Sequence, residues 1–350
     1  MRTWLAVVAL LVASGCAPAA PVDPVTPAPQ LPARAVPAGA LDPMLRDFAY
    51  PFPVAHHQLR SQRQELVMAY VDVAPPAQAS VPATGRVALL LHGKNFSAAY
   101  WAPTIRVLVA AGFRVIAPDQ IGFGKSSKPE RFQFAFEALA EHTRSLLDRL
   151  GVDQVTVIGH SMGGMLAVRF ALMFPARTER LALINPIGLE DWRAHVPAAT
   201  IDELYEKELA ATPASIREYQ RTAYYGGTWK PAYEPLTEIL AGWTRHPEYP
   251  KVAWNAALTA DMIFTQPVVH EFPRITVPTL LVIGQRDRTA IGKDRAPPDV
   301  AAQLGDYPTL GRRAAAQIPG ARLVELPGVG HLPQVEAFDA YASALLEFLR

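Results

Sequence analysis

Residues 155–174 read VTVIGHSMGGMLAVRFALMF, and this stretch decides how the rest of the chain must be arranged. Its first four residues are β-branched, which favours a strand, and the small and apolar residues after Gly163 favour a buried helix. Between them, Ser161 stands at the apex of a turn in which a side chain at Gly159 or Gly163 would meet the neighbouring strand or helix. The Ser161 hydroxyl is therefore expected at a helix N-terminus, where free N–H groups favour developing negative charge. A glycine-rich turn that only packs a helix on a sheet is the alternative.

Composition describes a globular chain that is long enough to bury a large core. Its 350 residues allow one domain with an insertion, or two domains. The formal net charge is only +1, so no basic surface for nucleic acid is indicated. Cys16 is the only cysteine, so stability must come from packing rather than from an internal disulfide.

The first 16 residues are typical of an export signal. Arg2 is followed by the apolar run Trp4–Val12, which is too short to span a bilayer as a stable helix. Three small residues then precede Cys16, and this pattern resembles the signal of bacterial lipoproteins, in which the cysteine is lipidated. The resemblance implies export in a bacterium, with a lipid anchor on Cys16 that holds the protein to a membrane in the periplasm or at the outer membrane. An ordinary secretory signal, cut after Ala19, would instead give a soluble periplasmic or secreted protein.

Residues 17–44 are rich in proline and alanine and lack any periodicity. Such a composition predicts an extended, semi-rigid tether rather than a packed structure. From Leu45 the composition becomes that of a globular domain.

After residue 45, strands and helices alternate, and the strands are continuous apolar runs. This pattern predicts an α/β fold with a mostly parallel central sheet and helices on both faces. The first two predicted strands, 65–73 and 86–91, have no helix between them and are expected to form an antiparallel edge. Further strands are expected at 114–118, 155–158, 180–184, 279–283 and 322–325.

The alternation stops between residues 187 and 272. Thr200 with Glu203 matches a capping box, and Thr212-Pro213 matches an N-cap followed by proline, so the segment is expected to be helical. It is rich in large aromatic side chains, which are Trp192, Tyr205, Tyr219, Tyr224, Tyr225, Trp229, Trp243 and Trp254 among others. A helical insertion at the catalytic end of a sheet predicts a cap over a hydrophobic pocket, with residues 45–186 and 273–350 as the core.

Three polar residues follow predicted strands in the order Ser161, Asp287, His331. A serine hydroxyl becomes a good nucleophile when a base removes its proton, and the base needs an anion to orient and stabilise it. Loops at the carboxyl ends of parallel strands bring such groups together. The other possible acid position, after strand 180–184, holds Asn185, which has no carboxylate. A surface or helix-end position is expected for His56, His57, His142, His195, His246 and His270.

A set of short motifs resembles the α/β-hydrolase superfamily over roughly residues 45–350. The motifs are His92-Gly93, the Asp119-x-x-Gly-x-Gly-x-Ser126 turn, the Gly-x-Ser161-x-Gly turn, Gly-x-x-Asp287 and Gly-x-Gly-His331. The stretch IGFGKSSKP is similar to the capped branch that contains epoxide hydrolases, haloalkane dehalogenases, C–C bond hydrolases and esterases. The first two use an aspartate nucleophile, and serine stands at that position here.

The resemblance also implies an oxyanion hole made by two backbone N–H groups, those of Lys94 and Met162. Preorganised donors of this kind stabilise the negative oxygen of a tetrahedral intermediate. Asn95 is an alternative donor beside Lys94. His92 is expected to brace its loop, and Asp119 to organise its glycine turn.

The sequence therefore predicts a capped α/β-hydrolase that cleaves a small or medium, largely apolar carboxylic ester through an acyl-serine intermediate. Ser161 attacks, His331 transfers the proton and Asp287 orients the imidazole. No cofactor or metal is expected, because zinc-binding spacing and a nucleotide fingerprint are both missing from the motifs. A C–C bond hydrolase, or an amidase or aminopeptidase for small substrates, would use the same triad. A binding protein that kept the fold without the activity is an alternative of a different class.

Overall fold

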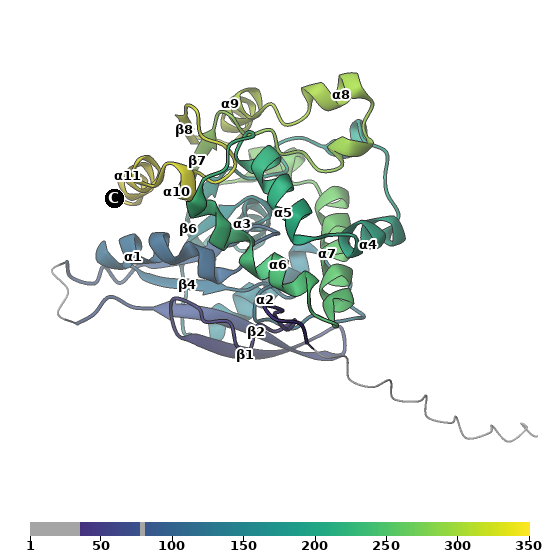
Figure 1. Ribbon diagram of the computed structural model, residues 1–350. Helices are drawn as coiled ribbons and strands as arrows, with labels where there is room; N and C mark the ends of the chain where they lie inside the picture. The colour runs from purple at the N-terminus through teal and green to yellow at the C-terminus, as the bar shows by residue number, and fades with distance from the viewer. Residues whose placement is uncertain (1–35, 78–80) are drawn as a thin grey trace, which may run out of the picture. The chain divides into compact units, whose positions relative to one another are not determined.

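The computed structural model describes residues 36–77 and 81–350 (Figure 1). The predicted export signal, the lipidation of Cys16 and the predicted tether up to residue 35 lie outside these residues. Within the described ranges, no helix combines the length and the apolar character needed to cross a membrane.

An eight-stranded sheet forms the centre of the fold, with the strand order β1-β2-β4-β3-β5-β6-β7-β8. The six strands from β4 to β8 in this order run parallel, whereas β2 is antiparallel to both of its neighbours. The sheet is thus mostly parallel, as the sequence predicts. The strands are β1 (Val54–Ser61), β2 (Gln64–Val73), β3 (Val87–Leu91), β4 (Arg114–Pro118), β5 (Val155–His160), β6 (Thr178–Ile184), β7 (Thr279–Gly284) and β8 (Arg322–Leu326).

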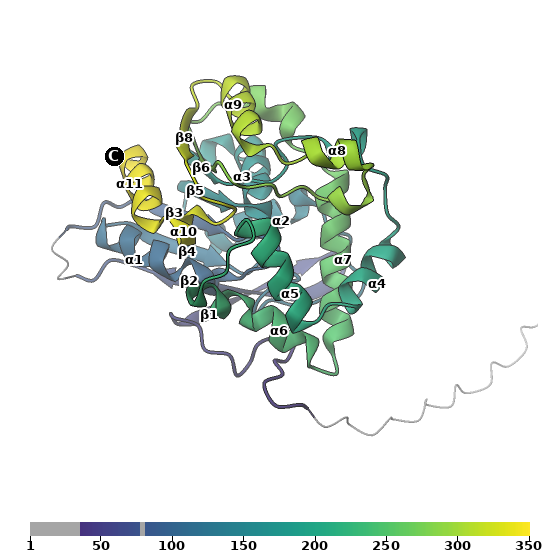
Figure 2. The same cartoon turned by 45° about the horizontal axis from the view of Figure 1, so that its top comes forward.

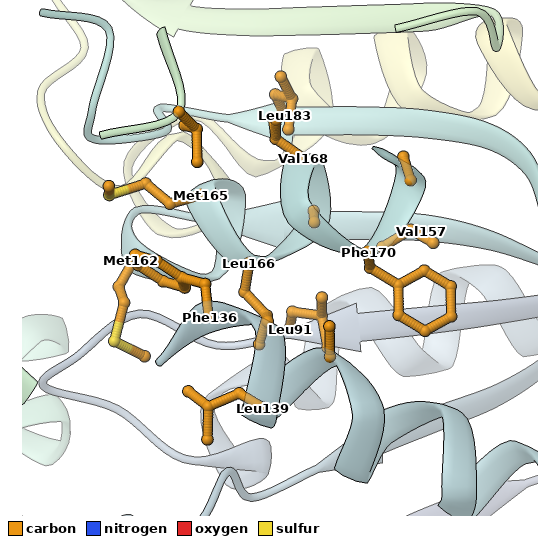
Figure 3. Close-up of a cluster of buried hydrophobic side chains, with 14 of the residues drawn as sticks. Leu91, Phe136, Leu139, Val157, Met162, Met165, Leu166, Val168, Phe170 and Leu183 are labelled. Carbon is orange, nitrogen blue, oxygen red and sulfur yellow. The ribbon is translucent and has the colours of Figure 1, made fainter. Parts of the chain in front are cut away.

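Helices cover both faces of the sheet. Neighbouring residues of each strand point to opposite faces, and here the residues on both faces are apolar. Leu90 of β3 packs in a cluster with α1 and α11, whereas Leu89 and Leu91 pack in a second cluster with α2 and α3. Figure 2 shows α1 and α11 together on one side of the sheet, and Figure 3 shows the second cluster around Leu166 of α3. The helices are α1 (Ala102–Ala110), α2 (Phe136–Arg149), α3 (Met162–Met173), α4 (Ile201–Leu209), α5 (Pro213–Tyr219), α6 (Glu238–Thr244), α7 (Tyr249–Thr265), α8 (Pro298–Gln303), α9 (Tyr307–Gln317), α10 (Pro333–Glu336) and α11 (Phe338–Leu349).

The antiparallel edge differs from the prediction. Residues 65–73 and 86–91 do not pair with each other, because β4 lies between them, and β2 forms its hairpin with β1 instead. The turn of this hairpin is Gln62-Arg63, and both residues have positive φ, 48° and 62°. Such turns are usually marked by asparagine and glycine, so this hairpin has no recognisable signal in the sequence.

Strand β1 also explains why two histidines expected at the surface are buried. Only His57 and Leu59 of β1 are buried, and the residues on either side of them are exposed. The His57 Nε2 atom lies 3.0 Å from the Ser145 hydroxyl of α2, the helix that also buries His142. A short half-buried strand with polar residues on its outer face does not stand out from a loop by composition.

The connection after β7 contains the short helix α8, which begins with Pro298 at its first position.

The start of ordered packing differs from the prediction. Residues 41–44, expected in the tether, lie against α6. The Leu41 N–H donates to the Gly242 carbonyl at 3.0 Å, and the Trp243 indole N–H donates to the Asp42 carbonyl at 3.1 Å. The neighbouring Leu45 side chain is fully buried against Trp243, so ordered packing begins a few residues before the predicted boundary.

The predicted cap, residues 187–272, lies between β6 and β7. All of its residues are described, and they form α4, α5, α6 and α7 but no strand. Figure 1 shows these four helices gathered on one side of the molecule, next to the sheet. Both helix N-caps predicted in this segment are present, since the N-cap residues Thr200 and Thr212 each form a capping box.

Candidate active site

The turn between β5 and α3 places Ser161 in strained backbone. Its φ is 56°, a region that residues with side chains rarely occupy. The two flanking glycines allow the turn, because a Cβ at Gly159 would lie 2.1 Å from the Gly163 carbonyl oxygen, and one at Gly163 would lie 2.1 Å from that of Leu91. The chain therefore holds Ser161 at the apex, directly before the first residue of α3.

Ser161, His331 and Asp287 are joined by two hydrogen bonds. The Ser161 hydroxyl lies 3.0 Å from His331 Nε2, and His331 Nδ1 lies 2.6 Å from Asp287 Oδ2. The three residues follow β5, β8 and β7, so the parallel sheet brings together groups that are up to 170 positions apart. All three are buried, and Ser161 keeps only 6% of its surface exposed. In this arrangement His331 can accept the serine proton while Asp287 holds the proton on Nδ1.

The Asp287 carboxylate is surrounded by hydrogen-bond donors. Oδ2 also accepts from the Asn185 amide at 2.8 Å, and Oδ1 accepts from the Thr289 N–H at 2.8 Å. Burial by itself would raise the pKa of Asp287, but the attraction of His331 and these hydrogen bonds hold its pKa below the ordinary value. Asp287 is therefore a carboxylate at neutral pH. Asn185 stands at the alternative acid position of the sequence, and here it supports the acid instead.

A second chain of hydrogen bonds joins the loop that contains Gly93 to the loop that contains His331. The Gly93 N–H donates to the Tyr100 hydroxyl at 3.4 Å, which lies 3.0 Å from His160 Nδ1, and His160 Nε2 lies 2.9 Å from the His331 carbonyl oxygen. Because a carbonyl only accepts, His160 carries its proton on Nε2 and accepts the Tyr100 proton on Nδ1. Burial is the main reason why the pKa of His160 lies well below its ordinary value, and the nearby His331 lowers it further. His160 is therefore neutral. The sequence does not reveal this role of Tyr100 and His160, although His160 stands next to the nucleophile.

Lys94 and Met162, the predicted oxyanion-hole residues, both belong to segments next to Ser161. Met162 follows Ser161 and begins α3, and a Cβ at Gly93 would lie 3.0 Å from the Ser161 Cβ, so the loop that contains Lys94 is next to the nucleophile. Among the described residues, neither the Lys94 N–H nor the Met162 N–H donates to a protein acceptor. Both groups are thus available to a negatively charged oxygen beside Ser161. The Lys94 side chain points elsewhere and forms an ion pair with Glu208 of α4 at 2.6 Å.

His92 and Asp119 brace the loops around this site. His92 Nδ1 donates to the Gly93 carbonyl at 2.9 Å, and His92 Nε2 accepts the Gln120 N–H at 3.0 Å. The Asp119 carboxylate accepts the backbone N–H groups of Ala98 and Lys125 at 2.6 and 2.7 Å. Both side chains are fully buried and engaged with backbone, which fits the bracing roles expected of them.

Tyr224 of the predicted cap contacts the catalytic histidine candidate directly. Tyr224 lies over the His331 imidazole, with 4.6 Å between the ring centres, and its carbonyl accepts the backbone N–H of His331 at 2.9 Å. The sequence marks Tyr224 only as one of many aromatic residues of the cap. Its contact with a residue 107 positions later is decided by tertiary structure.

Comparison with known proteins supports this fold. A family model, the alpha/beta hydrolase family, matches residues 88–344. The chain is similar to a 2-hydroxy-6-oxo-6-phenylhexa-2,4-dienoate hydrolase of Burkholderia cepacia, with 28% identity over 272 residues that cover 76% of this chain and 88% of the relative. It is also similar to a thermophilic esterase from Thermogutta terrifontis, with 25% identity, a TM-score of 0.62 and coverage of 85% of this chain and 98% of the esterase.

A crystal structure from Pseudomonas aeruginosa PAO1, described as a probable hydrolytic enzyme, resembles the chain much more closely. Its sequence is 52% identical, and its fold matches with a TM-score of 0.86 over 89% of this chain and 98% of that one. With the family match over most of the chain and these hydrolases among its relatives, the protein is a hydrolytic enzyme that belongs to the α/β-hydrolase family.

Proposed function

We propose that this enzyme hydrolyses carboxylic esters of small or medium, largely apolar substrates through an acyl-serine intermediate. The observation that carries the proposal is the hydrogen-bonded row from Ser161 through His331 to Asp287. The similarity to an esterase supports it at the level of reaction class.

The proposed reaction has two halves. His331 Nε2 takes the proton of Ser161 as Oγ attacks the ester carbonyl, and the resulting oxyanion accepts the N–H groups of Lys94 and Met162. When the intermediate collapses, the bond to the leaving oxygen breaks and His331 returns the proton to the alcohol. Water then attacks the acyl-serine with the same help from His331, which releases the acid and restores Ser161.

The test is a comparison of substrates on the purified enzyme. A series of p-nitrophenyl esters is expected to give turnover with a burst of p-nitrophenol, and a fluorophosphonate probe is expected to label Ser161 covalently. The corresponding p-nitroanilides are expected to react far more slowly, whereas equal turnover of anilides would favour an amidase. Absence of labelling in the folded protein would reject a serine nucleophile altogether.

A second candidate function is the cleavage of a carbon–carbon bond. It is favoured by the relative from Burkholderia cepacia, whose name gives a 2-hydroxy-6-oxo-dienoate as substrate. The same three residues would serve this reaction. Loss of the absorbance of 2-hydroxy-6-oxo-6-phenylhexa-2,4-dienoate, at a kcat/KM above that for any ester of the series, would assign the enzyme to this class instead.

The proposed oxyanion role of Lys94 belongs to its backbone N–H and does not need its side chain. Lys94→Ala keeps the N–H and removes the ion pair with Glu208, so most activity on neutral esters is expected to remain. Lys94→Pro removes the donor itself, and kcat is expected to fall by roughly 10²–10³. Circular dichroism and thermal melting must first show that the proline variant is folded, because proline also restricts the loop. An equal loss of kcat in both variants would contradict the backbone role.

We also propose that Cys16 carries a lipid anchor in the exported protein. The proposal depends on the export signal in the sequence alone, and one acyl chain binds membranes only weakly, so stable anchoring requires the multiply acylated cysteine of a lipoprotein. In a bacterial host, Cys16→Ser is expected to move the protein from the membrane fraction to the soluble fraction without a change in specific activity. Wild-type protein that is already soluble after signal cleavage would instead support simple secretion.

A further inference from the structure

Tyr224 connects the predicted cap to the loop that contains His331. It ends a π-helical turn, Gln220–Tyr224, that directly follows α5, and such turns occur often at functional sites. Its carbonyl accepts the backbone N–H of His331 at 2.9 Å, and its ring stacks on the imidazole with an angle of 26° between the ring planes. The approach is so close that a Cβ at Gly330 would lie 2.0 Å from the Tyr224 carbonyl oxygen. The cap backbone and the His331 loop therefore fit together only because residue 330 is glycine.

The other end of Tyr224 reaches the loop of the proposed oxyanion hole. Its hydroxyl accepts the Asn95 amide at 2.7 Å, and Asn95 follows Lys94. Lys94 in turn is held by Glu208 of α4, so two consecutive residues of this loop are bound by side chains of the cap. Asn95, the alternative oxyanion donor of the sequence, has its amide directed to Tyr224. One tyrosine thus contacts both the proposed base and the loop of the proposed oxyanion hole.

The tyrosine also lies where it can affect the charge on His331. A cation over the face of an aromatic ring is stabilised, and the ring of Tyr224 is stacked on an imidazole that becomes positively charged during the proposed reaction. Tyr224 is itself 5% exposed, so this contact is shielded from water. The edge of Tyr219 packs against Tyr224, with 5.3 Å between ring centres, which limits rotation of the stacked ring.

We propose that Tyr224 is a positioning residue through which the docked cap completes the active site. Its carbonyl holds the His331 backbone N–H, and its ring packs on the imidazole, so that the imidazole keeps the orientation that reaches Ser161. Its hydroxyl holds Asn95 so that the Lys94 N–H faces the oxyanion. The inference rests on the proposed acyl-serine mechanism, and it adds that the site is fully assembled only when the π-helical turn is docked on His331.

Four variants separate the two ends of Tyr224. Tyr224→Phe keeps the ring and removes the hydroxyl, and its kcat/KM for a p-nitrophenyl ester is expected to fall about tenfold. Asn95→Ala is expected to cause the same loss, and the double variant no further loss, because both changes break one contact. Tyr224→Leu removes the stacked ring as well and is expected to lose about 100-fold. Additive losses in the double variant would contradict a shared contact.

The pH profile of kcat/KM tests the contact with His331. Without the stacked ring the imidazolium is less stable, so the acid limb in Tyr224→Leu is expected to move to lower pH by about half a unit, whereas it stays in place in Tyr224→Phe. The control is Tyr233→Leu, which removes another buried ring of the cap, one that stacks on Tyr225 at 3.7 Å. This control is expected to lower the melting temperature without moving the limb. If Tyr224→Leu gives the same profile as Tyr233→Leu, Tyr224 only packs the cap and the inference is wrong.

Labelling by a fluorophosphonate distinguishes a wrong role for Tyr224 from a wrong proposed function. If the wild-type enzyme is not labelled at Ser161, the acyl-serine mechanism itself is wrong. If wild type and Tyr224→Leu are labelled at the same rate, the mechanism stands and the positioning role of Tyr224 is rejected. Slower labelling of Tyr224→Leu with a wild-type rate in Tyr233→Leu is the expected result.

Discussion

Ser161→Ala is expected to abolish ester turnover and fluorophosphonate labelling while the protein stays folded. The variant removes the atom that the proposed mechanism uses as nucleophile, and loss of such an atom typically lowers kcat by about 10⁵–10⁶-fold. The remaining rate comes from binding and from the oxyanion hole. Steady-state kinetics and labelling of the purified variant, both compared with wild type, provide the measurement.

The fold is expected to tolerate this change for two reasons. The hydroxyl of Ser161 has His331 Nε2 as its hydrogen-bond partner, and no backbone group of the elbow depends on it. Alanine also has a Cβ, so the positive φ of residue 161 is no more strained than before. Ser343→Ala, at an exposed position of α11, is the matched control and is expected to keep full activity and labelling. Full activity in a purified Ser161→Ala variant would contradict the assignment of the nucleophile.

Asp287→Asn is expected to lower kcat by about 10⁴-fold at neutral pH. The carboxylate has three neighbours that all donate hydrogen bonds: His331 Nδ1, the Asn185 amide and the Thr289 N–H. The amide that replaces it has only one oxygen, so its NH₂ group must face at least one of these donors. If NH₂ faces His331, the imidazole proton moves to Nε2, and His331 can no longer accept the proton of Ser161.

The second orientation of the introduced amide is also unfavourable, because NH₂ then meets the N–H of Thr289. The Asp287→Asn variant is therefore expected to lose about 1–3 kcal/mol of stability, the usual cost of an unsatisfied buried group. Activity and thermal melting are measured together, with Asp299→Asn as the control. Asp299 is exposed on α8 in the same connection after β7, and its variant is expected to match wild type in both measurements. A kcat for Asp287→Asn within tenfold of wild type would mean that another group orients His331.

Local patterns in the sequence predict the parallel core closely. The central strands contain continuous apolar runs, such as Val87–Leu91 of β3 and residues 181–184 of β6, and β4 begins and ends at the predicted residues 114 and 118. Because helices cover both faces of the sheet, the residues on both sides of a central strand are apolar, and such a continuous apolar run is easy to recognise in the sequence. The candidate residues Ser161, Asp287 and His331 follow from the same patterns, because each lies in the loop after a predicted strand. The structure places them within hydrogen-bond distance, and their catalytic roles await the variants described above.

The sequence predicts structure poorly where one side of a segment faces water, or where a segment packs against residues that are distant in the chain. Strand β1 has polar residues on its outer face and a Gln62-Arg63 turn, so neither composition nor turn residues reveal it. Residues 41–44 have the composition of a tether, yet they lie against α6, because Gly242 leaves space for Leu41. Burial of a leucine depends on what the rest of the fold offers it.

By itself, the sequence determined the fold class, the elbow at Ser161 and the three strand ends that carry the candidate site, because these depend on residues adjacent in the chain. Only the tertiary structure decided how the site is supported. Asn185 meets Asp287 across 102 positions, and Asn95 meets Tyr224 across 129. Hydrogen bonds between such distant residues depend on the angle at which the loops meet, and no local pattern of residue types records that angle.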